Sequence, residues 1–156
     1  MMKKLYIVLI ILVFFAGVVY FTGLYTYFVR KDVQEALPMP SASVESPTVL
    51  AQGTFGEVDF IHKGSGTAKI IEVGGKRILR LENFNVVSGP DLYVYLSETT
   101  SPTGDIASLG NFLDLGVLKG TSGNQNYEIP SDPGGRRTVV VWCKRYGVLF
   151  TYAVMR

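Results

Sequence analysis

The sequence predicts an all-β domain, an antiparallel β-sandwich or barrel of about eight strands, preceded by one N-terminal transmembrane helix. Three observations predict this architecture: an uncharged apolar run over residues 5–29, a segment rich in proline and serine after it, and then short alternating runs separated by glycine-rich turns. No segment after residue 35 keeps a helical period. Many short strands joined by tight turns are typical of sandwiches and barrels.

The apolar run predicts a membrane anchor. The 25 residues from Leu5 to Val29 carry no charge, and a helix of that length, roughly 37 Å at about 1.5 Å per residue, crosses a hydrocarbon core of about 30 Å. A short basic N-terminus usually stays in the cytoplasm. We therefore expect residues 1–4 in the cytoplasm, a single pass over 5–29, and an extracytoplasmic C-terminal domain. The alternative is a cleaved signal peptide, whose apolar region is normally shorter and is followed closely by a small-residue cleavage site.

The segment 30–52 predicts a linker, and residues 53–156 predict the β domain. Prolines 38, 40 and 47 hold the linker extended, and the small polar residues between them bury little surface. Glycines 74 and 75 predict a two-residue hairpin, because both positions tolerate a positive φ. We expect strands at 54–62, 67–73, 76–84, 92–97, 112–118, 125–130, 137–144 and 147–155, with a loop at 98–111.

Strand parity assigns side chains to faces. In the run 92–97, the leucines and valine at 92, 94 and 96 face the core, and Tyr93 and Tyr95 lie on the other face. In the run 54–62, Val58, Phe60 and His62 share one face. The run 138–143 is apolar on both faces, which predicts a central strand that is covered on both sides.

Composition excludes several functions. A net charge of +2 gives no strong field for nucleic acid, and no nucleophile-elbow pattern supports a hydrolase. The chain has one cysteine, Cys143, and one histidine, His62, which are too few for a usual structural zinc site or for blue copper. The Cys-x-x-Cys-His motif of c-type haem is absent. Non-covalent haem needs only one good axial ligand, so that option stays open for Cys143 or His62.

The role of Cys143 stays open at this point. It can be a buried apolar filler, a reactive thiol, a ligand or an intermolecular partner. Strand parity places it with Val139 and Val141, which favours burial. It also ends its strand, and the cations of Lys144 and Arg145 favour a thiolate if they come within reach. His62 is the second candidate ligand, although a histidine at a strand edge more often has a structural role.

Seven motifs, agreeing in order and spacing, resemble the DM-thirteen domain over about residues 53–155. The motifs are Gly53-x-Phe55, His62 with Gly64-Ser65-Gly66-x-Ala68, Leu79-x-Leu81-Glu82-Asn83-Phe84, Gly89-Pro90-Asp91-Leu92-Tyr93-Val94-Tyr95-Leu96-Ser97, Leu115-Gly116-x-Leu118-Lys119-Gly120, Gly123-Asn124-Gln125-Asn126-Tyr127-x-Ile129-Pro130 and Val141-Trp142-Cys143-Lys144.

The resemblance implies an extracytoplasmic electron-transfer module. In that family a signature cysteine is suggested to act as a free thiol or as a ligand to a prosthetic group such as haem, and that role maps onto Cys143. We therefore expect a redox domain that is anchored by residues 5–29 and meets a redox partner protein at the cell surface. The rival hypothesis is a cell-surface binding or adhesion module in which Cys143 is core packing. If they are exposed on the sheet face opposite the core, Tyr93 and Tyr95 are its candidate contact residues.

Overall fold

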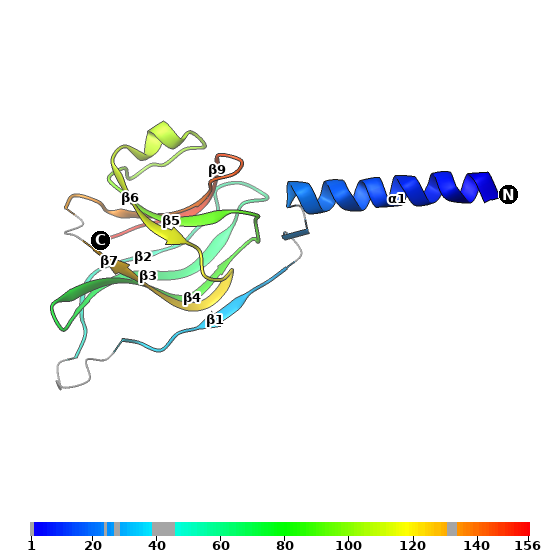
Figure 1. Ribbon diagram of the computed structural model, residues 1–156. Coiled ribbons are helices and arrows are strands. Elements are labelled where there is room, and N and C mark those ends of the chain that lie inside the picture. Colours follow the sequence, from blue (N-terminus) through cyan, green and yellow to red (C-terminus); the bar gives the residue numbers. More distant parts are fainter. Residues whose placement is uncertain (1, 24, 27–28, 39–45, 131–133) are drawn as a thin grey trace.

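The computed structural model describes residues 2–23, 25–26, 29–38, 46–130 and 134–156 (Figure 1). Within these residues, nine strands form two sheets that pack face to face, and the helix α1 (Met2–Thr22) projects away from them. The expected all-β sandwich with an N-terminal helix is confirmed.

The first sheet has five strands in the order β1-β7-β4-β3-β2. Their bounds are β1 (Asp32–Gln34), β7 (Ser122–Ile129), β4 (Lys76–Val86), β3 (Gly64–Val73) and β2 (Thr48–Thr54). All neighbours are antiparallel except β1 and β7, which run parallel. The predicted hairpin between β3 and β4 is confirmed, and its two glycines, Gly74 and Gly75, have φ values of 57° and 73°.

The second sheet has four strands in the order β6-β5-β8-β9. Their bounds are β6 (Phe112–Val117), β5 (Leu92–Ser97), β8 (Thr138–Cys143) and β9 (Val148–Val154). All six residues of β8 are buried, and β8 lies between β5 and β9. The prediction of a central strand over 138–143 is therefore confirmed.

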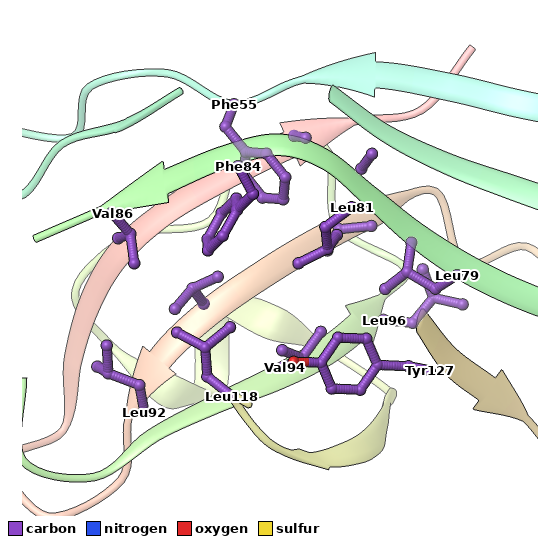
Figure 2. Close-up of a cluster of buried hydrophobic side chains, with 14 of the residues drawn as sticks. Phe55, Leu79, Leu81, Phe84, Val86, Leu92, Val94, Leu96, Leu118 and Tyr127 are labelled. Atoms are coloured by element: carbon purple, nitrogen blue, oxygen red, sulfur yellow. The ribbon is translucent and has the colours of Figure 1, made fainter. Parts of the chain in front are cut away.

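The main core fills the space between the sheets (Figure 2). From the first sheet, β4 contributes Leu79, Leu81 and Phe84, and the ring of Phe84 meets that of Phe55 edge to face at 4.9 Å. From the second sheet, β5 contributes the side chains at 92, 94 and 96, as strand parity predicts. Because both sheets place apolar residues on their inner faces, burial holds them together without a cross-link.

A second apolar cluster covers the outer face of the four-stranded sheet. The loop 98–111 folds back over this face and places Leu109, the end of a short 3₁₀ helix (Ile106–Leu109), against Val140 and Trp142. The hydroxyl of Ser97 donates a hydrogen bond of 2.6 Å to the Leu109 carbonyl. Tyr95 is consequently only 3% exposed, so the expectation of an exposed Tyr95 contact residue is wrong.

The expected strand over 54–62 is also wrong. Strand β2 ends at Thr54, and the chain then turns. The Asp59 carboxylate accepts hydrogen bonds of 2.7 Å from the backbone N–H groups of both Ile61 and His62. Such local side-chain bonds compete with a sheet ladder, and they leave Phe60 at the tip of a loop instead of on a sheet face.

The two ends of the segment 30–52 are part of the first sheet, although we expected a linker there; residues 39–45 lie outside the described residues. Residues 32–34 form β1, and residues 48–52 belong to β2. The close approach of β1 to β7 depends on Gly123, because a Cβ at that position would overlap the Val33 carbonyl oxygen. Pro38 and Pro47, two of the prolines that suggested a linker, lie outside both strands.

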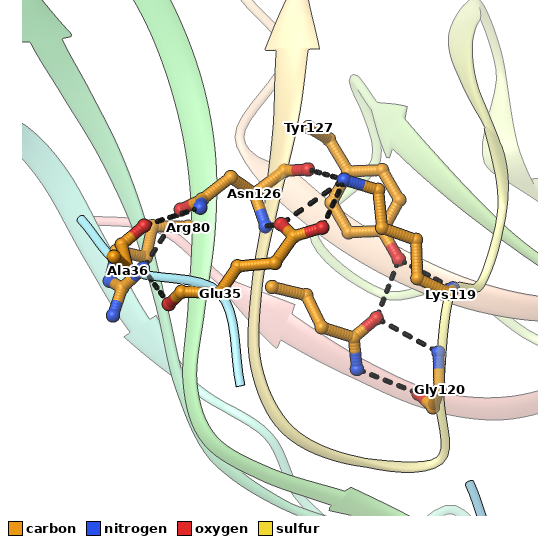
Figure 3. A network of polar contacts seen from close by, with 8 residues as sticks. Glu35, Ala36, Arg80, Lys119, Gly120, Asn126 and Tyr127 are labelled. Atoms are coloured by element: carbon orange, nitrogen blue, oxygen red, sulfur yellow. Dashed lines mark hydrogen bonds and ion pairs between the residues drawn. The ribbon is translucent and has the colours of Figure 1, made fainter. Parts of the chain in front are cut away.

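Polar contacts hold the segment that follows β1 against the sheet (Figure 3). Lys119 donates from Nζ to Glu35 Oε1 at 2.8 Å, and the Asn126 N–H donates to Glu35 Oε2 at 2.7 Å. Arg80 donates to the Glu35 carbonyl at 3.2 Å. Desolvation raises the pKa of Glu35, but these bonds from Lys119 and Asn126 outweigh it and lower the pKa overall. We call residues 32–36 the strap.

Candidate functional site

Cys143 is the last residue of β8, and its side chain is fully buried. Its backbone pairs with Leu92 on one side and Val148 on the other, and its side chain belongs to the core between the sheets together with Val139 and Val141. The prediction from strand parity is thus confirmed. The residue nevertheless stands one position before an exposed turn, residues 144–147, which is closed by a 2.9 Å bond from the Gly147 N–H to the Cys143 carbonyl.

The two cations that follow Cys143 point to other partners. The Nζ of Lys144 lies 4.6 Å from the centre of the Tyr93 ring, which packs on the outer face of the sheet. The guanidinium of Arg145 lies beside Gly23, just past the end of α1. The sulfur of Cys143 faces the inner core instead. The structure therefore gives no support to a thiolate that is stabilised by Lys144 in the closed fold.

His62 has its own set of contacts. Its Nδ1 lies 2.7 Å from Asp59 Oδ2, and its ring packs at 4.7 Å against the ring of Phe150. The hydrogen bond to His62, with those from the backbone, lowers the pKa of Asp59 to about 2. Among the described residues, no hydrogen bond or ring contact joins His62 to Cys143, and no group of three or more histidine, cysteine and acidic side chains could hold a metal ion.

A buried sulfur does not fit an axial haem ligand in the closed fold. An axial ligand has to reach an open face of the macrocycle, whereas Cys143 is covered on all sides. Cys143 also lines none of five hollows found at the surface of the described residues.

A hollow lined by aromatic side chains lies on the outer face of the four-stranded sheet, where Trp142 and Lys144 flank Cys143 in sequence. Tyr95, Phe112 and Trp142 form its floor, Lys144 and the loop at Gly104–Ile106 form its rim, and its volume is about 530 Å³. The rings of Tyr95 and Phe112 lie 4.6 Å apart. Sequence reasoning missed this hollow because part of its wall, Gly104–Ile106, comes from the loop 98–111. The available signal was the aromatic side chains at alternate outward positions.

Desolvation, with smaller contributions from the charges of Asp114, Tyr93 and Asp91, raises the pKa of Tyr95 to about 12. The phenol therefore stays neutral at physiological pH and acts in the hollow as a hydrogen-bonding and apolar group.

A protein-family model described as Electron transfer DM13 matches residues 54–155 of this chain. The chain belongs to the electron transfer DM13 family. The match covers Cys143, His62 and every strand from β3 to β9, so the resemblance drawn from the sequence is confirmed. No curated protein and no solved structure matches the chain.

The DM13 match begins after the N-terminal helix. In α1, the stretch Lys3–Thr22 has a mean hydropathy of 2.7, and none of it is buried against the rest of the chain. By length and composition it is able to cross a membrane, a property that a signal sequence near the N-terminus shares. The helix ends seven residues before the end of the expected span, 5–29.

Proposed function

We propose that this chain is an electron-transfer domain that α1 holds at the outer face of a membrane, where it exchanges electrons with a partner protein. The observation that carries the proposal is the DM13 match over residues 54–155. The exposed, apolar α1 supports the anchor. Cys143 is the residue through which we propose that the exchange occurs, because it is the only thiol in the sequence and a thiol forms and breaks disulfide bonds reversibly.

The proposed reaction is thiol–disulfide exchange with a disulfide of the partner. The Cys143 thiol loses its proton, and the thiolate attacks one partner sulfur. A new S–S bond joins the two proteins, the partner S–S bond breaks, and the second partner sulfur leaves as a thiolate that takes up the proton. A chain with one cysteine forms this mixed disulfide but cannot resolve it alone. A separate small thiol completes the transfer: its thiolate attacks the Cys143 sulfur, the S–S bond to the partner breaks, and the partner leaves as a dithiol after taking up the proton of that thiol. The partner disulfide is thereby reduced, and Cys143 remains in a disulfide with the small thiol.

Access to the sulfur requires local opening at the end of β8. Besides the ladder pairing of Cys143 with Leu92 and Val148, two bonds close this end: the one within the turn 144–147 and a 2.9 Å bond from the Lys144 N–H to the Asp91 carbonyl. All four turn residues are exposed. A strand end with few bonds and an exposed turn opens more readily than a strand centre, so we expect the thiol to react from a partly opened state.

Alkylation kinetics on the full chain test this access. The thiol of Cys143 should react in native buffer faster than global unfolding allows, at a rate that barely changes at low denaturant. The matched control is the double variant Cys143→Ala with Val139→Cys, which places a thiol on the same strand and face but away from the turn. The control should react only as the domain unfolds. Equal behaviour of the two thiols contradicts a redox role for Cys143.

Two further measurements decide the chemistry. A covalent adduct on non-reducing gels that disappears in Cys143→Ala supports the exchange reaction. A Soret band that appears on haem titration and disappears in the same variant assigns Cys143 to a ligand role instead.

The second candidate function is a binding module, and the aromatic hollow favours it. In that case Cys143→Ala leaves activity in cells unchanged, whereas Phe112→Ala, which removes part of the floor of the hollow, abolishes it. The hollow replaces the sheet face around Tyr93 as the contact surface, since Lys144 covers the ring of Tyr93. Tyr95 belongs to this surface only as a nearly buried part of the lining of the hollow.

A further inference from the structure

We propose that the end of the β domain nearest α1 rests on the lipid surface, with Phe60 and Ile61 inserted among the lipids. The inference rests on the proposed role of α1 as an anchor and is independent of the chemistry of Cys143. We call the exposed side chains of Val58, Phe60 and Ile61 the apolar tip. The surface that the apolar tip contacts is the membrane that α1 spans.

The end of the domain that faces α1 includes the loops of residues 55–63, 87–91 and 144–147 (Figure 1). The hydroxyl of Tyr146 donates a 2.6 Å hydrogen bond to the Thr22 carbonyl at the end of α1. Pro90 lies beside Gly23, and Arg30 shares a hollow with Lys63 and Val87. All three loops therefore lie where the chain leaves the bilayer.

The loop 55–63 presents apolar side chains to solvent. Phe60 is 85% exposed, Ile61 is 48% exposed, and Val58 is also exposed. An aromatic ring and two aliphatic side chains that are exposed together on one loop are typical of an interaction surface. Aromatic and aliphatic side chains gain free energy at the boundary between headgroups and acyl chains.

Hydrogen bonds within the loop fix the turn that carries the apolar tip. Asp59 accepts from two backbone N–H groups, and the Val58 N–H donates to the His62 carbonyl at 2.9 Å. At the base of the loop, Phe55 is buried in the core and the His62 ring packs on Phe150. The loop therefore holds Phe60 outward at little cost in conformational entropy when it meets a surface.

The segment between the end of α1 and the strap is too short to let the loop end of the domain move far from the bilayer. The strap is hydrogen-bonded to the sheet from residue 32 onward, so only residues 23–31 separate it from the end of α1. Fully extended, that segment spans roughly 30 Å. The contacts of Tyr146 and Arg145 at Thr22 and Gly23 place the end much closer.

The charges around the apolar tip suit anionic headgroups. Basic side chains outnumber acidic ones there: Arg30, Lys31, Lys63, Lys144 and Arg145 against Asp32, Glu57, Asp59 and Asp91. Glu57 pairs with Lys63 at 3.3 Å and Asp59 pairs with His62, which leaves four basic side chains against Asp32 and Asp91. The basic surplus next to exposed apolar groups is the combination that anionic lipid surfaces attract.

Fluorescence quenching by brominated lipid tests the contact. The full chain is placed in nanodiscs of phosphatidylcholine and phosphatidylglycerol with brominated acyl chains. Phe60→Trp puts an indole at the tip. The matched control, Lys76→Trp, puts one on an exposed position beside the β3–β4 turn, at the other end of β3 from Gly64. The native Trp142 is buried in the domain and gives both variants the same background.

We expect the Phe60→Trp emission to be quenched severalfold more than the Lys76→Trp emission. Chain that sits in the discs with equal quenching in both variants overturns the docking and leaves the anchor standing. Chain that fails to enter the discs overturns the anchor and the docking together. Ile61→Trp repeats the measurement at the neighbouring position, should the first variant fold poorly.

Discussion

At the residue scale, the surroundings of Cys143 set the cost of replacing it. Its side chain touches only core residues and makes no hydrogen bond in the described part of the chain. Cys143→Ser buries a hydroxyl in the same place and should lower the free energy of unfolding by about 1–3 kcal/mol. Cys143→Ala removes one sulfur atom and should cost about 1 kcal/mol.

Denaturant unfolding of the two variants measures this difference. If the Cys143→Ser variant has the same free energy of unfolding as Cys143→Ala, the serine hydroxyl must find a hydrogen-bond acceptor or a water molecule at this position. Alanine is accordingly the better substitution for functional tests, since loss of activity in the serine variant can arise from instability alone.

The Asp59 carboxylate predicts a pH-dependent loop. Its pKa is lowered from 3.8 to about 2 by the hydrogen bonds from His62 and the loop backbone. A carboxyl with a lowered folded pKa stabilises the fold fully above its unfolded pKa, and the contribution is lost as the pH falls through the folded pKa. The loop should therefore loosen between about pH 4 and pH 2.

The amide resonances of Ile61 and His62 report this transition, with a midpoint near pH 2. Asp59→Asn, which keeps the acceptor oxygen and removes the titration, should abolish it. A midpoint near 3.8 in the native chain would mean that the carboxylate makes no such bonds in solution.

Strand parity at this scale correctly placed Cys143 in the core, because the inward direction of a strand residue is fixed by its neighbours. The position of the Lys144 head group was not predictable, since a long side chain swings to whichever aromatic face lies nearby. The three-residue spacing of Asp59 and His62 is compatible with a turn that brings the two side chains together. The prediction of a regular strand over 54–62 excluded that turn.

At the element scale, the two sheets approach closely where β2 meets β9. The N–H of Gln52 donates to the Arg156 carbonyl at 2.9 Å, and the Arg156 N–H donates to the Gln52 carbonyl at 2.9 Å. A Cβ on Gly53 would overlap the Val154 carbonyl oxygen, which is backbone and cannot move aside cheaply. Gly53→Ala should therefore lower the free energy of unfolding by about 1–3 kcal/mol.

Gly56→Ala is the matched control, because a Cβ there meets no atom within 4 Å. Thermal or denaturant unfolding compares the two variants. Identical midpoints would show that the sheets part at this edge in solution.

The strap depends on Glu35, which ties β1 to the loop before β7 and to β7 itself. Glu35→Ala removes the acceptor for Lys119 and for the Asn126 N–H. Hydrogen bonds to charged groups are worth about 1.5–3 kcal/mol, so hydrogen exchange at Asn126 should accelerate by about tenfold or more. Glu57→Ala, which breaks only an exposed ion pair, should leave that exchange unchanged.

Elements that rest on local signals were predictable: the glycine hairpin, the alternation of β5 and the apolar β8. The strap was not, because β1 is three residues long and carries no apolar period of its own. Its place is decided by Gly123 and Lys119, some 90 residues away in sequence, so only tertiary contact shows that the segment is a strand.

At the scale of the whole molecule, α1 is either retained as a membrane anchor or cleaved off as a signal sequence. We expect chain recovered from membranes to keep the helix, and its intact mass to include residues 2–22. Alkaline extraction should leave it in the membrane pellet, because a predominantly apolar span of 20 residues inserts stably. A mature mass that starts beyond Thr22 would contradict the anchor.

The sandwich itself was predictable from composition and turns, since two amphipathic sheets have few other ways to cover their apolar faces. The candidate site was only half predictable. The sequence names Cys143 but does not reveal that the sulfur faces inward while an aromatic hollow opens on the reverse of the same sheet.

The parallel pairing of β1 with β7 has a mechanical consequence for a tethered domain. A pull between membrane and domain acts on the N-terminal end of the strap, along the axis of β1. The ladder bonds to β7 lie across that axis, so the load falls on all of them at once in shear instead of unzipping them singly. The strap and β7 therefore bear the tension between membrane and domain, and β8 with the thiol at its end is not loaded.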